Sequence, residues 1–151
     1  MTLTLGQLQL VSFNCRGWNN GKSIVSDLLE SHDICLIQEH WLFHDHLHEL
    51  NFNPDFLSVG VSGMDSFALH HGRPFGGCAI LFRKSLIGSV IMLSTNAKHF
   101  CALRLSDQSA AGQIILLVCV YLPTDYSSAT SREDFLLAFG ELKGFICCTI
   151  F

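Results

Sequence analysis

An asparagine and a glutamate, each at the end of an apolar segment, are the residues in this chain best suited to metal chemistry. Asn14 follows Leu8–Phe13 and comes shortly before Gly17, and Glu39 follows Ile34–Gln38. Functional groups often cluster where strands end in loops, because the sheet fixes their positions there. Magnesium prefers oxygen ligands and commonly takes only one or two protein carboxylates. The pattern therefore favours Glu39 as a metal ligand and Asn14 as a second ligand or an orienting amide.

Each of these two residues also has a purely structural explanation. An asparagine close to a glycine is common in turns, and a lone glutamate at the end of a strand is commonly a solvated surface charge. If both segments are strands of one sheet, Asn14 and Glu39 face one pocket. That combination, rather than either residue alone, favours a functional site.

A series of histidines follows Glu39 and could in principle bind zinc. His40, His44 and His48 are spaced four residues apart and would line one face of a helix. Structural zinc sites usually add cysteine or further histidine ligands at fixed spacing, and the sequence contains no Cys-x-x-Cys pair and no His-Glu-x-x-His motif. We therefore expect adventitious metal binding or none at these histidines. The pair His70–His71 lies in a polar segment and is expected to be exposed.

The elements that must hold these residues are mainly strands. Apolar segments rich in β-branched and aromatic residues alternate with Gly, Asn, Ser or Asp clusters, which is typical of strands. The pattern predicts strands at Leu8–Phe13, Ile34–Gln38, Phe56–Val61, Cys78–Arg83, Ser89–Leu93, Phe100–Leu105 and Ile114–Tyr121. It predicts helices at Lys22–Ser31 and Ser131–Leu142, the second with a buried stripe of Phe135, Leu136, Phe139 and Leu142.

The arrangement of these elements predicts one layered α/β domain. Several predicted strands are apolar on both faces, which requires a sheet that is covered on both sides. No repeat or linker divides residues 1–151. The apolar segment Gly144–Phe151 resembles the start of another buried strand, so we expect a domain that is incomplete at its C-terminus or an aberrant, out-of-frame tail, with a short closing strand as the alternative.

Composition limits the possible functions. Hydrophobic residues make up 49% and charged residues 15% of the 151 residues, which suits one domain with a sizeable core. The longest apolar run, Ile114–Leu122, is about half of the roughly 20 residues that a membrane-spanning helix needs. The first ten residues lack the basic and cleavage features of a secretory signal. We expect an intracellular protein, nuclear or cytoplasmic, with no membrane partner.

Charge and cysteine content add two further expectations. The formal net charge of −4 argues against strong general attraction of this chain to nucleic acid, so any DNA contact has to be local. Seven cysteines is an odd number, and most of them lie within apolar segments. Buried, reduced thiols are expected rather than a disulfide framework.

Four segments occur in the order of a known family. They are Ser12–Gly17 (SFNCRG), Cys35–Trp41 (CLIQEHW), Gly72–Leu81 (GRPFGGCAIL) and Val118–Pro123 (VCVYLP). As a set they resemble LINE-type retrotransposon endonucleases, which are relatives of the abasic-site repair endonucleases in the endonuclease/exonuclease/phosphatase superfamily. The resemblance implies an α/β/β/α sandwich and cleavage of a DNA phosphodiester.

The resemblance also implies roles for individual residues. Glu39 becomes the ligand of Mg²⁺, with Mn²⁺ as a substitute, and Asn14 the active-site amide beside it and a further metal ligand. Tyr121 becomes a hydroxyl near the scissile phosphate, although it could instead be an aromatic residue packed on Pro123. Arg73, which precedes a glycine turn, is the best candidate for a phosphate contact, with a solvated charge as the alternative. No small-molecule cofactor is implied.

The sequence departs from the family pattern in two ways. Thr124 stands where the repair relatives usually have an asparagine, with Asp125 next to it, and the later Gly-Asp-x-Asn and Asp-His motifs are absent. Without those motifs the attacking water lacks a general base. We expect a truncated endonuclease domain with little or no activity alone, whose parent polyprotein adds a reverse transcriptase domain. The alternatives are a non-catalytic relic or binding module, and a phosphatase or phosphodiesterase of the same superfamily.

Overall fold

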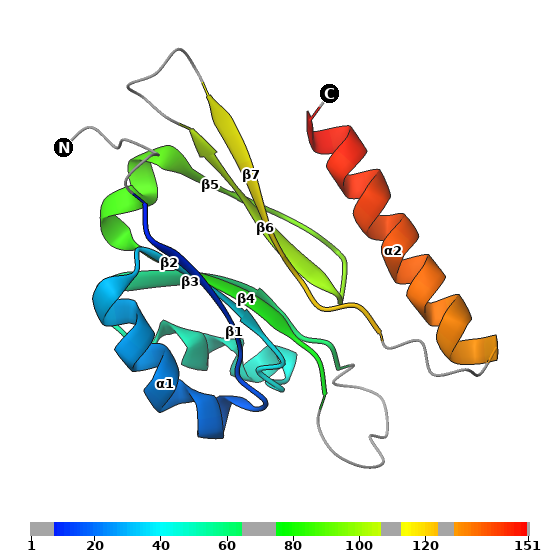
Figure 1. Cartoon of the computed structure of the whole chain (residues 1–151), viewed down its shortest axis with the longest axis horizontal. Helices are drawn as coiled ribbons and strands as arrows, with labels where there is room; N and C mark the ends of the chain where they lie inside the picture. Colours follow the sequence, from blue (N-terminus) through cyan, green and yellow to red (C-terminus); the bar gives the residue numbers. More distant parts are fainter. Residues whose placement is uncertain (1–7, 65–74, 107–112, 124–128, 151) are drawn as a thin grey trace.

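Two β-sheets lie face to face in the computed structural model of the chain, with helices on their outer surfaces (Figure 1). The structure describes residues 8–64, 75–106, 113–123 and 129–150. The first sheet has the strand order β1-β2-β4-β3 and the second β5-β6-β7. The strands are β1 (Leu10–Asn14), β2 (Ile34–Gln38), β3 (Phe56–Val61), β4 (Cys78–Arg83), β5 (Val90–Leu93), β6 (Phe100–Ser106) and β7 (Ile114–Val120). The helices are α1 (Trp18–Ser31), α2 (Ala129–Ile150) and the 3-10 helices η2 (His44–Asn51) and η3 (Lys84–Ser89).

A parallel pair of strands forms one side of the first sheet. β1 and β2 pair in parallel, with Asn14 opposite Gln38, and α1 makes the crossover between them. The ends of both strands therefore lie at the same edge of the sheet. β2 and β3 each pair with β4 in the antiparallel direction, which places the start of β4 at that edge as well.

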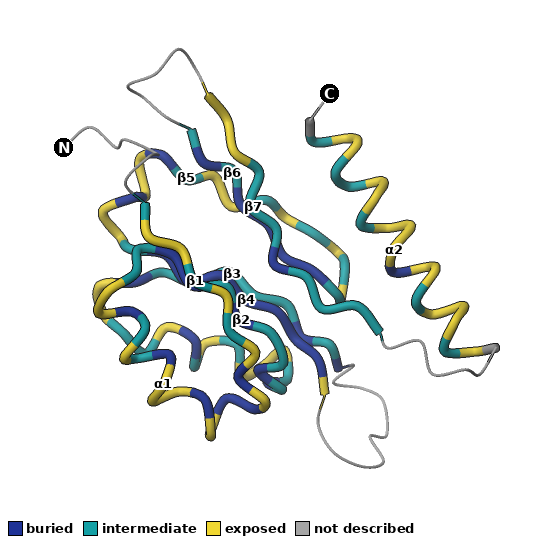
Figure 2. Tube along the Cα trace, in the orientation of Figure 1, coloured by how far each residue is buried: buried dark blue, intermediate teal, exposed yellow. Residues whose placement is uncertain are grey.

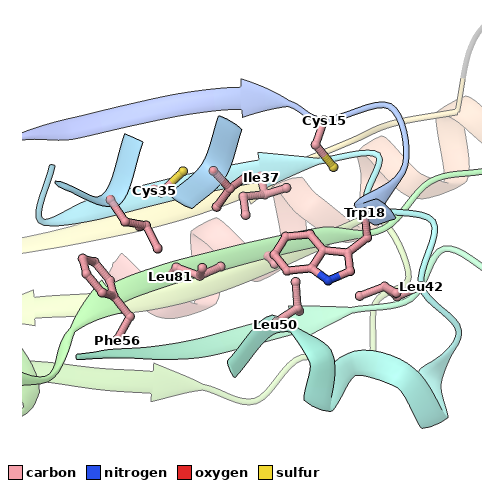
Figure 3. Packing of buried hydrophobic residues seen from close by; sticks show 11 residues of the cluster. Cys15, Trp18, Cys35, Ile37, Leu42, Leu50, Phe56 and Leu81 are labelled. Carbon is pink, nitrogen blue, oxygen red and sulfur yellow. The ribbon is translucent and has the colours of Figure 1, made fainter. Parts of the chain in front are cut away.

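Helix α1 covers the outer face of the first sheet because its apolar residues lie on one side. Trp18, Val25 and Leu29 are buried there. They pack with Ile37 of β2, Leu81 of β4 and other buried residues in one cluster (Figure 3). The Trp18 and Phe52 rings meet edge to face at a centroid distance of 5.4 Å, which closes this cluster on the side of η2.

A second cluster fills the space between the two sheets. Its buried residues include Ile80 and Phe82 of β4, Leu103 of β6 and Cys119 of β7. Figure 2 shows buried positions concentrated along β4 and β6, with exposed or intermediate positions along most of α2. Both faces of β4 are therefore covered, as the continuous apolar pattern of Cys78–Arg83 predicted.

Helix α2 corrects two predictions from the sequence. Residues Gly144 to Ile150 continue the helix and form no strand. The Phe145 ring packs on the Phe100 ring of β6, with 5.1 Å between the ring centroids. The apolar residues of this segment thus cover part of the second sheet as one side of a helix. The predicted buried stripe is also wrong, because Leu136 is 55% and Phe139 48% exposed, whereas Ala138 is only 3% exposed.

The predicted fold class and the predicted state of the cysteines can also be compared with the structure. The layered α/β/β/α arrangement is confirmed, with α1 and α2 as the outer layers (Figure 1). Five of the seven cysteines are buried and Cys147 and Cys148 are exposed, all as free thiols. Among the described residues, no helix combines the length and the apolar character needed to cross a membrane.

Candidate active site

Asn14 and Glu39 meet at the shared edge of β1 and β2. The Asn14 side chain donates a hydrogen bond from Nδ2 to Glu39 Oε1 at 2.7 Å. The Asn14 Oδ1 atom accepts a hydrogen bond from the backbone N–H of Arg16 at 3.2 Å, which fixes the orientation of the amide. Because the amide is held at both ends, its N–H₂ group points at the carboxylate. The structure thus brings together the two residues that the sequence selected as a pair.

The backbone of Glu39 is held from two sides. On one side, the Gly17 N–H donates to Glu39 O at 2.8 Å, next to a bond from Trp18 N–H to His40 O. On the other side, the Glu39 N–H donates to Gly77 O at 2.9 Å. Glu39 has a φ of 56°, a left-handed conformation that is uncommon outside glycine. Such strain is often found at functional sites, and here the surrounding hydrogen bonds maintain it.

His40 forms a buried support beneath this loop. Its side chain is fully buried, its Nδ1 accepts the Leu42 N–H at 3.0 Å, and its Nε2 lies 3.1 Å from Val61 O. An imidazole that accepts at Nδ1 and donates at Nε2 is neutral. Burial lowers the pKa of His40, and the Val61 carbonyl opposes this only in part. His40 thus ties the Glu39 loop to the end of β3.

Two glycines make room for this arrangement. A Cβ atom on Gly77 would lie 2.4 Å from His40 Cε1, and Gly77 has a φ of 88°. Gly76 has a φ of 69° and accepts a hydrogen bond from the Trp41 N–H at 3.1 Å. Side chains at either position are strained by the backbone conformation, and at Gly77 the imidazole leaves no space. The glycine pair is therefore part of the support for Glu39.

Tyr121 follows β7 in the second sheet and lies close to the same loop. Its N–H donates to His99 O at 2.8 Å, and a Cβ atom on Gly76 would lie 3.9 Å from Tyr121 Cδ1. The sheets are also bridged nearby, because Gln38 Nε2 donates to Cys119 Sγ at 3.3 Å. Gln38 directly precedes Glu39. This bridge fixes the end of β7, and with it Tyr121, relative to the first sheet.

Other candidates from the sequence lie elsewhere or outside the described residues. Arg73, Thr124, Asp125 and the pair His70–His71 fall outside the described ranges. His44 and His48 lie on η2, whereas His40 is buried before that helix begins, so the three do not form one stripe. In the described part of the chain, no three His, Cys, Asp or Glu side chains are grouped as metal ligands.

The donor set at this edge fits a hard cation. It offers a carboxylate from Glu39 and an amide from Asn14, at a site where Asn14 is exposed and Glu39 partly so. Magnesium uses oxygen donors of this kind and keeps several waters or substrate oxygens. Sequence reasoning missed the role of His40, which was weighed only as a metal ligand. In the sequence, the consecutive glycines Gly76 and Gly77 were the signal that another group packs closely against the backbone there.

The layers and the paired residues at one sheet edge define an α/β/β/α sandwich protein with a site at the strand ends. The sequence model of the Endonuclease/Exonuclease/phosphatase family matches residues 11–144. The chain therefore belongs to this family. No curated protein sequence matches the chain.

Solved structures share the fold at low sequence identity. The catalytic domain of APE2 from Xenopus laevis matches with a TM-score of 0.63 and 14% identity, over 89% of this chain and 52% of that one. A 3′ phosphatase, NExo from Neisseria bound to a product DNA hairpin, matches with a TM-score of 0.52 and 16% identity, over 89% and 50%. The 3′-5′ exonuclease NExo from Neisseria meningitidis gives a TM-score of 0.53 at 16% identity, over 89% and 50%. The chain thus spans about half the length of these structures.

Proposed function

We propose that this chain is the metal-binding half of a DNA phosphodiester hydrolase of the retrotransposon endonuclease type. The observation that carries the proposal is the 2.7 Å hydrogen bond between Asn14 and Glu39 at the ends of two parallel strands. Family membership supports it, as do structural neighbours that include a 3′ phosphatase bound to a product DNA hairpin and a 3′-5′ exonuclease. The QEHWL segment favours the retrotransposon branch, in which a reverse transcriptase domain belongs to the same polyprotein.

Each residue contributes a distinct part of the chemistry. Glu39 Oε1 accepts from Asn14, so Oε2 is the oxygen that would bind Mg²⁺ or Mn²⁺. Asn14 holds the carboxylate in place; its own oxygen, which accepts from the Arg16 N–H, would have to turn toward Glu39 to bind the same metal. A bound metal ion stabilises charge on the phosphate and the leaving oxygen. Tyr121 would donate its hydroxyl to a phosphate oxygen, a form of electrostatic stabilisation that requires a fixed position.

The proposal includes low activity for the chain alone. In-line hydrolysis needs a base to activate the attacking water, and the motifs that supply this base in the family are absent from the sequence. An intracellular location, nuclear or cytoplasmic, is part of the proposal. The alternatives are a non-catalytic binding module and a phosphatase of the same family, and both would use the same edge of the sheet. The first test therefore asks whether this edge binds a metal ion.

The test measures Mn²⁺ binding by electron paramagnetic resonance in the wild-type chain and in Glu39→Gln. We expect Glu39→Gln to abolish measurable binding, because the amide keeps the shape and removes the charge. Glu30→Gln, which changes an exposed carboxylate on α1, is the matched control and should bind Mn²⁺ like wild type. Equal Mn²⁺ binding by wild type and Glu39→Gln would refute the proposed metal site.

A second assay addresses catalysis directly. Nicking of supercoiled plasmid is measured with Mg²⁺ and with EDTA for wild type and Glu39→Gln. We expect little or no nicking by either protein. Robust nicking that needs both Mg²⁺ and Glu39 would confirm the hydrolase and refute the inactivity of the chain alone. Nicking that needs neither would contradict the proposed mechanism.

A further inference from the structure

A cavity of about 530 Å³ lies between helix α2 and the ends of the two sheets. Its lining includes Gly76 and Tyr121, both close to the Glu39 loop, and Asp134 and Glu141 of α2. Gly76 accepts the Trp41 N–H, so one residue belongs to both the cavity wall and the support of the Glu39 loop. The cavity is therefore next to the candidate active site, and no role has yet been assigned to Asp134, Glu141 or Phe75 in its lining.

The charge of the cavity lining selects against phosphate. Two carboxylates, Asp134 and Glu141, line it, and no lysine or arginine is among the described residues that do so. Burial lowers the pKa of the His99 ring, and the negative charges of Glu141 and Asp134 oppose this lowering in part. The carboxylates thus act on the same region of the cavity as His99. Such a lining favours a ligand that presents N–H donors.

The shape-defining side chains favour a flat, apolar ligand. Phe75 is 56% exposed at this cavity, and Tyr121 and Pro123 add further rigid surface. Exposed aromatic side chains are common stacking surfaces for unpaired nucleobases. A nucleobase combines a flat ring with a polar edge, and a carboxylate recognises a base edge through its donor groups. Among the DNA bases, guanine presents two adjacent kinds of donor, the ring N1–H and the exocyclic N2 amino group.

We propose that this cavity binds an unpaired guanine next to the scissile phosphate, with Asp134 and Glu141 accepting hydrogen bonds from the N1–H and N2 amino groups. The inference rests on the proposed function, because Tyr121 connects the cavity to the phosphate position. Thymine fits less well, since its ring N–H is flanked by two carbonyl oxygens that the carboxylates repel. The acidic cavity would thereby determine sequence preference without adding general affinity for DNA.

The test uses residue-resolved NMR titration of the 151-residue chain with three single-stranded pentanucleotides in EDTA. Their sequences are TTGTT, TTITT with inosine in the centre, and TTTTT. Inosine lacks only the N2 amino group of guanine. One hydrogen bond from that group to a carboxylate corresponds to about a tenfold difference in Kd. We expect TTGTT to bind about tenfold tighter than TTITT and to shift the amide signals of α2 and Tyr121.

Matched variants separate recognition from folding. The double variant Asp134→Asn/Glu141→Gln should lose the difference between TTGTT and TTITT while it keeps the wild-type spectrum elsewhere. Glu133→Gln, an exposed neighbour on α2 that does not line the cavity, should retain the difference. Equal affinity of wild type for all three pentanucleotides would overturn the inference. So would a guanine preference that survives in the double variant.

The same experiment distinguishes failure of this inference from failure of the proposed function. Base recognition is measured without metal, so Glu39→Gln should leave the guanine preference unchanged. Guanine preference together with absent Mn²⁺ binding would refute the metal site and retain the base site. Mn²⁺ binding that depends on Glu39, together with equal affinity for all pentanucleotides, would refute the base site alone.

Discussion

Replacement of Gly77 by alanine is expected to destabilise the protein more than any comparable change at an exposed glycine. The added Cβ would lie 2.4 Å from His40 Cε1 and 2.6 Å from Nε2, so the imidazole must move. His40 is fully buried between two backbone partners, and movement breaks the bonds with Leu42 N and Val61 O. Alanine at a φ of 88° is strained as well.

The magnitude follows from these two contributions. A left-handed conformation costs a non-glycine residue about 1–2 kcal/mol. Loss of two hydrogen bonds by a buried group costs about 1–3 kcal/mol. The free energy of unfolding should therefore fall by about 2–5 kcal/mol, out of the roughly 5–15 kcal/mol that is usual for a domain. For a chain of this length, that corresponds to a decrease in Tm of about 4–20 °C.

Urea unfolding followed by tryptophan fluorescence measures this change, because Trp18 and Trp41 both lie beside the affected loop. Gly88→Ala is the matched control, since a Cβ atom there meets nothing within 4 Å, and it should leave stability nearly unchanged. The double variant His40→Ala/Gly77→Ala removes the collision and should cost less than the sum of the two single changes. A free energy of unfolding for Gly77→Ala within about 0.5 kcal/mol of wild type, the range usual for surface changes, would refute the reasoning.

Three further predictions concern pH, an arginine and the thiols. Burial lowers the pKa of His40 from 6.5 in the folded state, so the stability that the neutral imidazole contributes is present above pH 6.5 and is lost as the pH falls below it. In denaturation experiments the free energy of unfolding should therefore be lower at pH 5.5 than at pH 7.5. This difference should be smaller in His40→Gln, and an equal difference would contradict the prediction. Arg83→Lys should destabilise by about 1–3 kcal/mol in a thermal melt, because lysine cannot hold both Asp33 Oδ1 and Leu29 O as the guanidinium does; an unchanged Tm would contradict this. Burial raises the pKa of Cys15 to about 11 and of Cys35 to about 12, so a colorimetric thiol reagent at pH 8 should label only the exposed Cys147 and Cys148 in the folded chain, and fast labelling of additional thiols would refute the burial.

Much of the fold could be predicted from apolar patterns alone. The segments Ile34–Gln38, Phe56–Val61 and Cys78–Arg83 form strands with the predicted bounds. Their β-branched and aromatic content, together with polar residues at their ends, left little ambiguity. The segment after Gly144 was assigned the wrong structure, because a short apolar run has no periodicity that separates a strand from a buried helix. Only the packing of this segment on β6 in the folded structure shows that it is a helix.

The candidate site was predictable in part. Asn14 and Glu39 could be paired from their equivalent positions at strand ends, because parallel neighbours end at one edge of a sheet. His40 could not be assigned, since its partners are the backbone atoms of Leu42 and Val61, which carry no sequence signature. The cavity beside Tyr121 was equally hidden. It depends on where α2 lies relative to Gly76, and no local pattern determines that distance.

The hydrogen bonds on both sides of Glu39 have a consequence for the order of events during synthesis. One side is supplied by Gly17, which emerges from the ribosome before Glu39, and the other by Gly77, which emerges well after it. A nascent chain can form the β1-α1-β2 unit early, but Glu39 gains its second anchor only when β4 pairs with β2. Contacts between distant segments form slowly because closing the intervening loop costs entropy. The geometry of the proposed metal site is therefore a late product of folding, and an arrested chain that ends before Gly77 would carry both Asn14 and Glu39 without a formed site.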